Sequence, residues 1–355
     1  MSNLLRNKLE WSARKNFPDI RALIMRGYPS FIYESKPSRR REEIPVFVFH
    51  RVTPERFEAQ LNFLYHNGYQ TLTADELWEI LIGGKPVPRE AIALTFDDGT
   101  VSLWSVAFPL LKKYGFHAIS FIIPGCVPEK SDVRPSLEEF WQGKVRLEEI
   151  PLEISVPEPL CTWEEIRLMH QSGIIEFQSH TMYHHLIFTS AELVDFINPE
   201  FDYYLFGNIH VPVLRKDGRD LFDRVVALGT PIYRSSPRMG SQRRYFDNEG
   251  LRDECVRFVA ERGGQAFFQS QGWRRTLVRF FREAQKRYGK NGHFESATEQ
   301  RETIFRDLSE SKQRIERHLP GRKVRHLCYP WFLGICLSVA LSKEAFCVSI
   351  FLCIL

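Results

Sequence analysis

The sequence lacks several features that would assign the protein to a specialised class. It has no cysteines in CxxC spacing, and its seven cysteines are an odd number, which argues against a disulfide framework and a cysteine-ligated zinc site. No stretch reaches the roughly 20 apolar residues of a membrane span; the closest, 345–355, is too short. Residues 1–17 mix charges and contain no apolar signal-peptide core. We therefore expect a protein of the cytoplasm, which is a reducing compartment.

A strong excess of one charge is also absent. The formal net charge is +4 over 355 residues, and the most basic run, Arg39–Arg41, is followed directly by two glutamates. Such a mixed run is typical of a solvated linker rather than a nucleic-acid patch. With 43% hydrophobic and 26% charged residues, the composition is that of an ordinary globular protein. We expect no nucleic-acid partner, and the sequence does not predict an oligomeric state.

What the chain does contain is a recurring pattern of helix, glycine and apolar strand. Apolar residues spaced four and seven apart define one face of each helix. A glycine suited to the left-handed helix cap comes next, and a short apolar segment follows it. The glycines are Gly68, Gly115, Gly173 and Gly321, and the segments begin at Tyr69, Ala118, Ile174 and Val324. Thr162 and Glu165 form a capping box at the start of one helix.

This alternation predicts a parallel sheet covered by helices, either a barrel or a doubly wound sheet. Val46–Phe49 and Ala91–Phe96 supply two further strands. Two regions break the pattern. Residues 1–44 are expected to form an N-terminal helical arm and linker that precedes a β/α domain over 45–355. Within that domain, residues 186–296 show no clear periodicity, which is typical of a lid, a specificity insertion or an oligomer contact.

Polar motifs follow three of the predicted strands. Asp97-Asp98-Gly99 comes after the strand at Ala91–Phe96, His180 to His184 follow the next strand but one, and Pro330-Trp331 follows the last. The carboxyl ends of parallel strands meet at one face, where β/α enzymes build their sites. His50 ends the first predicted strand at the same face, so it is a candidate pocket residue.

Two histidines four residues apart, joined by a carboxylate from another strand, are a standard ligand set for a zinc-like ion. The residues between His180 and His184 include no acid, so a base must come from elsewhere. Asp97 and Asp98 supply a ligand and a base. Alone, Asp-Asp-Gly is usually a turn and HxxxH usually a packing feature. Their occurrence together on one face favours a functional metal site, in which the second carboxylate acts on a metal-bound water.

At these residues the sequence resembles a known family, the polysaccharide deacetylases (the NodB-homology domain, or carbohydrate esterase family 4). Thr95–Gly99 matches the first motif of the family, and His180–His184 matches the second, His-Ser/Thr-x-x-His. The resemblance runs from about 45 to 185 and resumes at about 300. It implies a distorted (β/α) barrel that removes N-acetyl, or sometimes O-acetyl, groups from a carbohydrate.

The resemblance also implies a role for each matching residue. Asp98, His180 and His184 would hold a divalent metal, usually Zn²⁺. Asp97 would be the general base for the water that attacks the acetyl carbonyl. Thr181 would shape the loop that carries the two histidines.

The third family motif, Arg-x-Pro-Tyr, aligns with Cys328–Trp331. The resemblance places Pro330 beside the substrate and makes the Trp331 N–H a candidate donor to the oxyanion. Cys328 stands where the family often has the Arg that orients the base, and Arg234, from the insertion, is a candidate substitute near the substrate.

The family's last motif brings a His that protonates the leaving amine, and this chain contains no His after Trp331. We therefore expect a barrel that is incomplete at its C-terminal end, with the final apolar stretch forming an unpaired strand.

Three functions remain open on this interpretation. The first is a metal-dependent carbohydrate deacetylase, which the intact aspartate and histidine pairs favour. The second is a catalytically impaired or inactive carbohydrate-binding relative, or a truncated gene product, which the missing last motif favours. The third is an amidase that acts on a small non-sugar amide, because the same ligand set would serve it.

Overall fold

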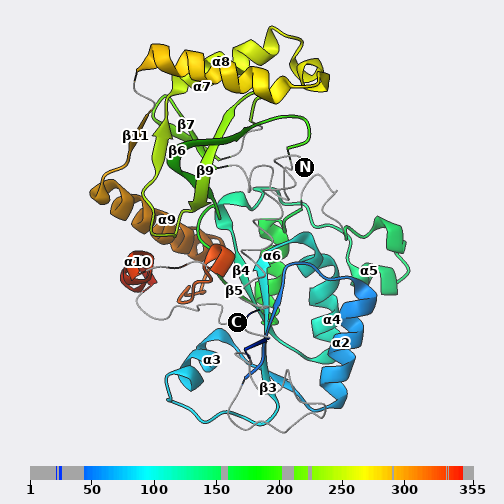
Figure 1. The fold of residues 1–355 in the computed structure, drawn as a ribbon. Helices are drawn as coiled ribbons and strands as arrows, with labels where there is room; N and C mark the ends of the chain where they lie inside the picture. Colours follow the sequence, from blue (N-terminus) through cyan, green and yellow to red (C-terminus); the bar gives the residue numbers. More distant parts are fainter. Residues whose placement is uncertain are drawn as a thin grey trace. The chain divides into compact units, whose positions relative to one another are not determined.

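The computed structural model describes Arg21, Ile24, Met25 and residues 44–152, 159–201, 212–222, 226–289, 292–332, 334 and 336–346 (Figure 1). Contacts group residues 45–86 and 90–355 into one compact unit, which contains all of the strands and helices named in this section. The predicted arm over 1–44 lies almost wholly outside the described residues, and so does the end of the chain after Phe346. The predicted division into domains stays a prediction.

The sheet of this unit is parallel and has the strand order β1-β3-β4-β5. Its strands are β1 (Val46–Phe49), β3 (Ala91–Asp98), β4 (Ala118–Ile122) and β5 (Ile175–Ser179), and the short β2 (Gln70–Thr71) pairs with the start of β3. All residues of β3 and β4 are buried, as expected for strands covered on both faces. The predicted parallel β/α sheet is confirmed, and its closure into a barrel is not seen among the described residues.

Helices accompany this sheet, some in contact with its strands and others packed on neighbouring helices, and their ends follow the sequence signals. They are α2 (Pro54–His66), α3 (Ala74–Leu81), α4 (Phe108–Tyr114), α5 (Leu137–Trp141), α6 (Trp163–Gln171), α9 (Ala297–His318) and α10 (Cys336–Phe346) (Figure 1). The four predicted cap glycines are all left-handed, with φ between 71° and 85°. Thr162 and Glu165 form the expected capping box at the start of α6. No helix among these residues is long and apolar enough to cross a bilayer.

The prediction of a strand over Val324–Tyr329 is wrong. In the described residues this segment forms an isolated parallel bridge with Ser179 instead of a strand. The backbone N–H groups of Arg325 and His326 both donate to the side-chain Oε1 of Gln178, at 3.1 and 3.0 Å. A side-chain amide therefore takes the place of a ladder between strands. The segment still runs beside the end of β5, where the polar motifs gather.

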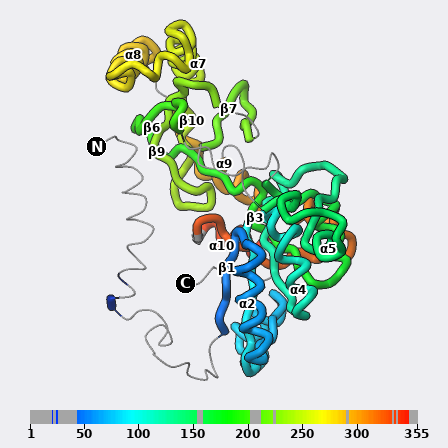
Figure 2. Tube along the Cα trace, turned by 90° about the vertical axis from the view of Figure 1, so that its right-hand side faces the viewer, coloured from blue at the N-terminus to red at the C-terminus, as the bar shows by residue number. Residues whose placement is uncertain are grey.

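Residues 186–296 contain more regular structure than their sequence pattern indicated. The long β6 (Leu186–Phe196) pairs antiparallel with β9 (Pro231–Pro237). The other elements are β7 (Leu214–Lys216), β8 (Arg219–Leu221), β10 (Tyr245–Asp247), β11 (Gly292–Phe294), α7 (Glu249–Ala260) and α8 (Trp273–Tyr288). Helices α7 and α8 pack side by side in both views (Figures 1 and 2). The insertion has a hydrophobic core of its own, which includes Phe196, Tyr233, Leu277 and Phe281.

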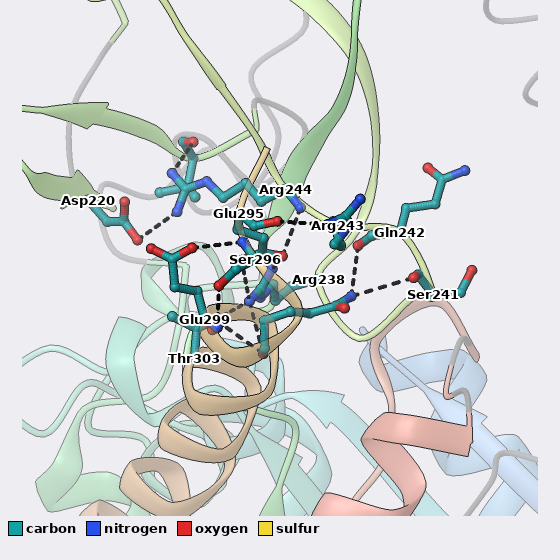
Figure 3. Close-up of polar contacts among 12 residues, drawn as sticks. Asp220, Arg238, Ser241, Gln242, Arg243, Arg244, Glu295, Ser296, Glu299 and Thr303 are labelled. Carbon is teal, nitrogen blue, oxygen red and sulfur yellow. Dashed lines mark hydrogen bonds and ion pairs between the residues drawn. The ribbon is translucent and has the colours of Figure 1, made fainter. Parts of the chain in front are cut away.

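A buried network of ion pairs fastens the insertion to the start of α9 (Figure 3). Arg238 donates to both carboxylate oxygens of Glu295, at 2.6 and 3.0 Å, and also to the carbonyl of Gln300. The backbone N–H of Arg244 reaches the same carboxylate at 2.8 Å, and the Arg244 guanidinium pairs with Asp220. The side chains of Arg238 and Glu295 are only 4% and 2% exposed. The loop after β9 and the N-terminal end of α9 are thereby held together.

Candidate metal and catalytic site

Three predicted ligands converge at the carboxyl end of the sheet. Asp98 is the last residue of β3, and His180 follows β5 directly. His184 lies four residues after His180, in the same loop. Asp98 Oδ1 lies 3.6 Å from His180 Nε2 and 3.9 Å from His184 Nε2. Ligand atoms around a tetrahedral zinc-like ion, with bonds of about 2.1 Å, are roughly 3.4 Å apart. The spacing therefore fits a single divalent ion.

The tautomer of His180 leaves Nε2, the nitrogen that faces Asp98, available to bind an ion. Its Nδ1 lies 2.8 Å from the carbonyl oxygen of Cys328. Because a carbonyl only accepts, Nδ1 carries the hydrogen and Nε2 presents a lone pair toward Asp98. Burial lowers the pKa of His180 to about 3 and holds the pKa of His184 well below its usual range. Both imidazoles are neutral near pH 7, which is the form that binds metals.

Within the described part of the chain, several buried polar atoms at this point have no hydrogen-bond partner. They are Oδ1 of Asp97, Oδ1 of Asp98 and Nδ1 of His184. An unpartnered buried polar group costs about 1–3 kcal/mol, and more when it is charged. Three such atoms within one cluster indicate that a partner from outside the chain completes it. A cation would meet that need for Asp98, and a water molecule beside it would meet it for Asp97.

The paired carboxylates have strongly raised pKa values. Burial, followed by the charge of Asp98, raises the pKa of Asp97 to about 8. Burial likewise raises the pKa of Asp98 to about 7, although the charge of Arg51 opposes the shift. Two adjacent buried acids cannot both ionise without a compensating positive charge. A divalent ion at Asp98 would supply that charge and leave Asp97 as the free neighbouring base.

An unusual backbone aims these side chains. Among the described residues, six that are not glycine have positive φ, and four of them belong to the site: Asp98 (68°), Thr181 (67°), His184 (48°) and Trp331 (53°). Consecutive residues of a strand normally point to opposite faces. Asp97 and Asp98 nevertheless both bring an oxygen within 4.8 Å of a ligand atom of His180. The left-handed turn at the end of β3 accounts for this shared direction.

Helix α9 supports the histidine loop with two polar residues that the sequence did not reveal. Asp307 Oδ1 accepts from the backbone N–H of Met182 at 2.9 Å, and the hydroxyls of Ser311 and Ser179 lie 2.6 Å apart. His185 faces Oδ2 of Asp307 at 3.9 Å. A signal was present, because Asp307 and Ser311 lie among the buried apolar positions of α9. Polar residues on the apolar face of a helix mark a specific partner.

His50 lies at the same edge of the sheet. Its backbone carbonyl accepts from the Thr100 hydroxyl at 2.5 Å, which ties the end of β1 to the Asp-Asp-Gly turn. The charge of His50 is among the causes that lower the pKa values of His180 and His184, after the dominant effect of burial. The side chain of His50 is exposed, unlike those of the two buried histidines. Its predicted place beside the pocket is compatible with this position.

The third motif lies against the ligands. The Trp331 ring is centred 4.2 Å from the ring of His184, and Pro330 begins the same short turn. The thiol of Cys328 lies 3.8 Å from Oδ2 of Asp97. The role of the Trp331 N–H as an oxyanion donor and that of Pro330 in substrate binding stay predictions.

Arg234 is not brought to Asp97. On β9, its guanidinium donates to both carboxylate oxygens of Glu192, at 2.7 and 2.8 Å, in an exposed pair. The group that contacts Asp97 is the Cys328 thiol, in the position where the family motif often has an arginine. Substrate binding by Arg234 remains a prediction that this geometry does not support.

One segment of the chain is similar in sequence to known proteins. Residues 84–197 match the sequence profile of a family described as polysaccharide deacetylase. YxkH of Bacillus subtilis (strain 168), provisionally named a polysaccharide deacetylase, is 31% identical over 128 residues, covering 34% of this chain and 44% of YxkH. The poly-beta-1,6-N-acetyl-D-glucosamine N-deacetylase of Escherichia coli (strain K12) is 28% identical over 137 residues, covering 39% of this chain and 18% of that protein. The chain therefore spans less than half the length of either relative.

Among solved structures, the chain is similar to the BpsB deacetylase domain from Bordetella bronchiseptica. The two share 17% sequence identity over 88% of each chain, with a TM-score of 0.49.

Proposed function

Residues 84–197 belong to the polysaccharide deacetylase family, and from this premise we propose that the chain hydrolyses acetyl amides on an N-acetylated polysaccharide. One observation carries the proposal. Asp98, His180 and His184 converge on the space of one divalent ion, and the buried carboxyl of Asp97 lies beside them. Zn²⁺ suits this ligand set best; when bound, it would supply a Lewis acid for the acetyl carbonyl and for water.

Asp97 is the general base of the proposed reaction. Burial raises its pKa to about 8, close to neutral pH, which suits a base that must accept a proton from the attacking water. Its Oδ1 has no hydrogen-bond partner within the described part of the chain, so this oxygen is available to water. The Cys328 thiol donates to the other oxygen and holds the carboxylate in place.

His50 is the proton donor that we assign to the leaving amine. Of the three imidazoles His50, His180 and His184, the last two are buried, neutral and committed as ligands, whereas the ring of His50 is exposed and can exchange protons with solvent. This assignment supplies a general acid from the end of the first strand of the sheet. The expectation that an acid must follow the third motif is then unnecessary.

The substrate class is a polymer of N-acetylated amino sugar. The named activity of the Escherichia coli relative, on poly-beta-1,6-N-acetyl-D-glucosamine, supports this choice. The Trp331 ring beside His184 also supports it, because sugar rings pack well against aromatic faces at the rim of a site.

The proposal is tested by acetate release. The purified chain is stripped with a chelator, reloaded with Zn²⁺, Co²⁺ or Mn²⁺, and incubated with β-1,6-linked and β-1,4-linked N-acetylglucosamine oligomers and with a small acetylated amide. We expect acetate from at least one oligomer, only in the metal-loaded protein. His184→Asn should abolish acetate release and the binding of Mn²⁺, an ion that prefers oxygen and nitrogen ligands.

His185→Asn is the matched control, because it removes the adjacent imidazole, which faces Asp307 rather than the ligands. It should retain one bound metal per chain. Release from the small amide alone would instead identify an amidase. Metal binding without release from any substrate would contradict the proposal and identify a binding-only relative.

A further inference from the structure

Cys328 brings a thiol into the same pocket. Its backbone N–H donates to the Ser179 carbonyl at 3.0 Å, which fixes the residue beside the end of β5. Its side chain is fully buried, and its Sγ lies 3.8 Å from Oδ2 of Asp97. A sulfur ligand is therefore built into a site otherwise made of oxygen and nitrogen.

Within the described residues, two overlapping sets of potential metal ligands occur. One is Asp98, His180 and His184; the other is Asp97, His180 and Cys328, and in each set the ligand atoms lie within 4.8 Å of one another. All the residues in both sets are buried. Oδ1 of Asp97 has no hydrogen-bond partner among the described residues, so the second set, like the first, contains a buried oxygen that a ligand could satisfy.

The two sets cannot hold ions at the same time, because they share one lone pair. The Nδ1–H of His180 is held by the Cys328 carbonyl, so only Nε2 can bind an ion. An ion at Nε2 can take its other two ligands from Asp98 and His184 or from Asp97 and Cys328. The pocket therefore offers two alternative positions for one metal.

The chemistry of the two positions differs. The first has one carboxylate and two neutral imidazoles, which suit zinc, cobalt and manganese. The second has one carboxylate and one thiolate, whose two negative charges would neutralise a divalent ion completely in a buried site. Thiolates select soft metals, and binding there would release the thiol proton to solvent.

We propose that Asp97, His180 and Cys328 form a second, inhibitory metal site that selects thiophilic divalent ions. An ion in this site uses Asp97 as a ligand, so Asp97 can no longer accept a proton from water. The identity of the metal then decides whether the chain is active or blocked. The inhibitory consequence rests on the proposed function, whereas the existence of the site does not.

Cadmium is the probe, because cadmium–thiolate bonds absorb in the ultraviolet. The metal-free chain is titrated with Cd²⁺, alongside Cys328→Ser, Cys255→Ser and His184→Ala. Cys255 is the matched control, since it is a buried cysteine in the core of the insertion. We expect one equivalent of tightly bound Cd²⁺ with a charge-transfer band. The band should be lost in Cys328→Ser and retained in Cys255→Ser and His184→Ala.

Retention of the band in Cys328→Ser, or its loss in His184→Ala, would overturn the second site. Circular dichroism verifies that each variant is folded, and Cys328→Ala replaces Cys328→Ser should the serine variant fail to fold. If acetate release is observed, Cd²⁺ should block it, and Cys328→Ser should need at least about tenfold more Cd²⁺ for the same block. If no form releases acetate, the proposed function fails, and the absorption titration still decides on the site.

Discussion

Two clusters of buried charge in this chain differ in how their polar atoms are satisfied. Around Glu295, both carboxylate oxygens accept from Arg238, and a backbone N–H adds a further bond (Figure 3). Around Asp98, by contrast, carboxylate and imidazole atoms are buried and have no hydrogen-bond partner among the residues that the structure describes. The first cluster carries its opposite charge within the chain, whereas the second needs a positive charge from outside.

This difference separates a structural cluster from a functional one without reference to any relative. A buried ion pair with complete hydrogen bonding holds two segments in register, here the insertion and α9. A buried cluster with unpartnered atoms destabilises the chain on its own, so its presence indicates a ligand. Substitutions in the two clusters should therefore have different effects on stability and on activity.

The largest expected effect is on activity, at Asp97. Asp97→Asn should reduce acetate release by about 10²–10⁴-fold, because it removes the base from the reaction. The free energy of unfolding should stay the same or rise, since a buried and partly unpartnered carboxyl is neutralised. Rate measurements and urea denaturation of the same preparation check both. A variant that kept its activity but lost stability would place Asp97 with the structural cluster.

The next effect is on stability, at Arg238. Arg238→Met should lower the free energy of unfolding by about 3–5 kcal/mol, because Glu295 is left buried without its partner. Urea denaturation measures the loss. The double variant Arg238→Met with Glu295→Leu should recover most of it, since neither charge then remains buried. A double variant as unstable as the single one would show that the pair is not the cause.

Binding of Mn²⁺, an ion that thiolates do not favour, should stabilise the chain by about 2.7 kcal/mol when the free ion is at about 100 times its Kd. The same gain is expected in Arg238→Met, because that cluster binds no ion. It should disappear in His184→Ala. Thermal unfolding with and without chelator measures the gain, and an undiminished gain in His184→Ala would show that the ion binds elsewhere.

A pH effect is expected at Asp307. Burial raises the pKa of this carboxyl to about 7, partly offset by the Met182 N–H and the charge of Arg238. The folded state therefore holds the proton more tightly than the unfolded chain, whose Asp has a pKa of about 3.9. Stability from this group is present below about pH 4 and is lost as pH rises toward 7, with a slope of at most about 1.4 kcal/mol per pH unit.

Asp307→Asn should remove this slope while keeping an oxygen for the Met182 N–H. The stability of the variant relative to the original chain should therefore increase as pH rises from 4 to 7. Denaturation curves for the metal-free proteins across this range give the comparison. A constant difference between the two would mean that Asp307 does not titrate there.

The smallest effect is expected at Arg234. Arg234→Ala breaks an exposed pair with Glu192, and exposed pairs contribute little because water screens them. Neither stability nor acetate release should change measurably. A clear loss of activity with unchanged stability would restore the prediction that Arg234 serves the substrate.

The sheet could be predicted from the sequence because its strands are short continuous apolar segments. Each begins soon after a helix-ending glycine or a polar turn, and β1, β3, β4 and β5 lie within two residues of their predicted limits. The strand predicted after Gly321 failed because the side chain of Gln178 accepts from two of its backbone N–H groups, an interaction that no backbone pattern reveals.

The insertion was harder to predict for two reasons. Its strands pair antiparallel across long sequence distances, as β6 does with β9. Its helix α8 does space buried residues by four and three, at Leu277, Phe281 and Ala284, but many arginines obscure that pattern. A helical signal was therefore present in the sequence, although a weak one.

At the site, the residues that carry the chemistry could be found because their motifs follow predicted strands. The residues that support them were missed: Asp307 and Ser311 stand out as polar residues on the apolar face of α9, but their partners lie more than a hundred residues away in the sequence. The left-handed conformations were equally hidden, since none of those positions is a glycine.

Those left-handed residues have a consequence for where local unfolding of the protein begins. Thr181 and His184 have left-handed backbone conformations that only glycine adopts without steric strain, so this loop is strained in the metal-free protein. A metal coordinated by His180 and His184 would restrain that loop in its strained conformation. After the metal is removed by a chelator, amide hydrogen exchange and proteolysis should therefore begin at residues 180–185, while the strands of the parallel sheet are still protected.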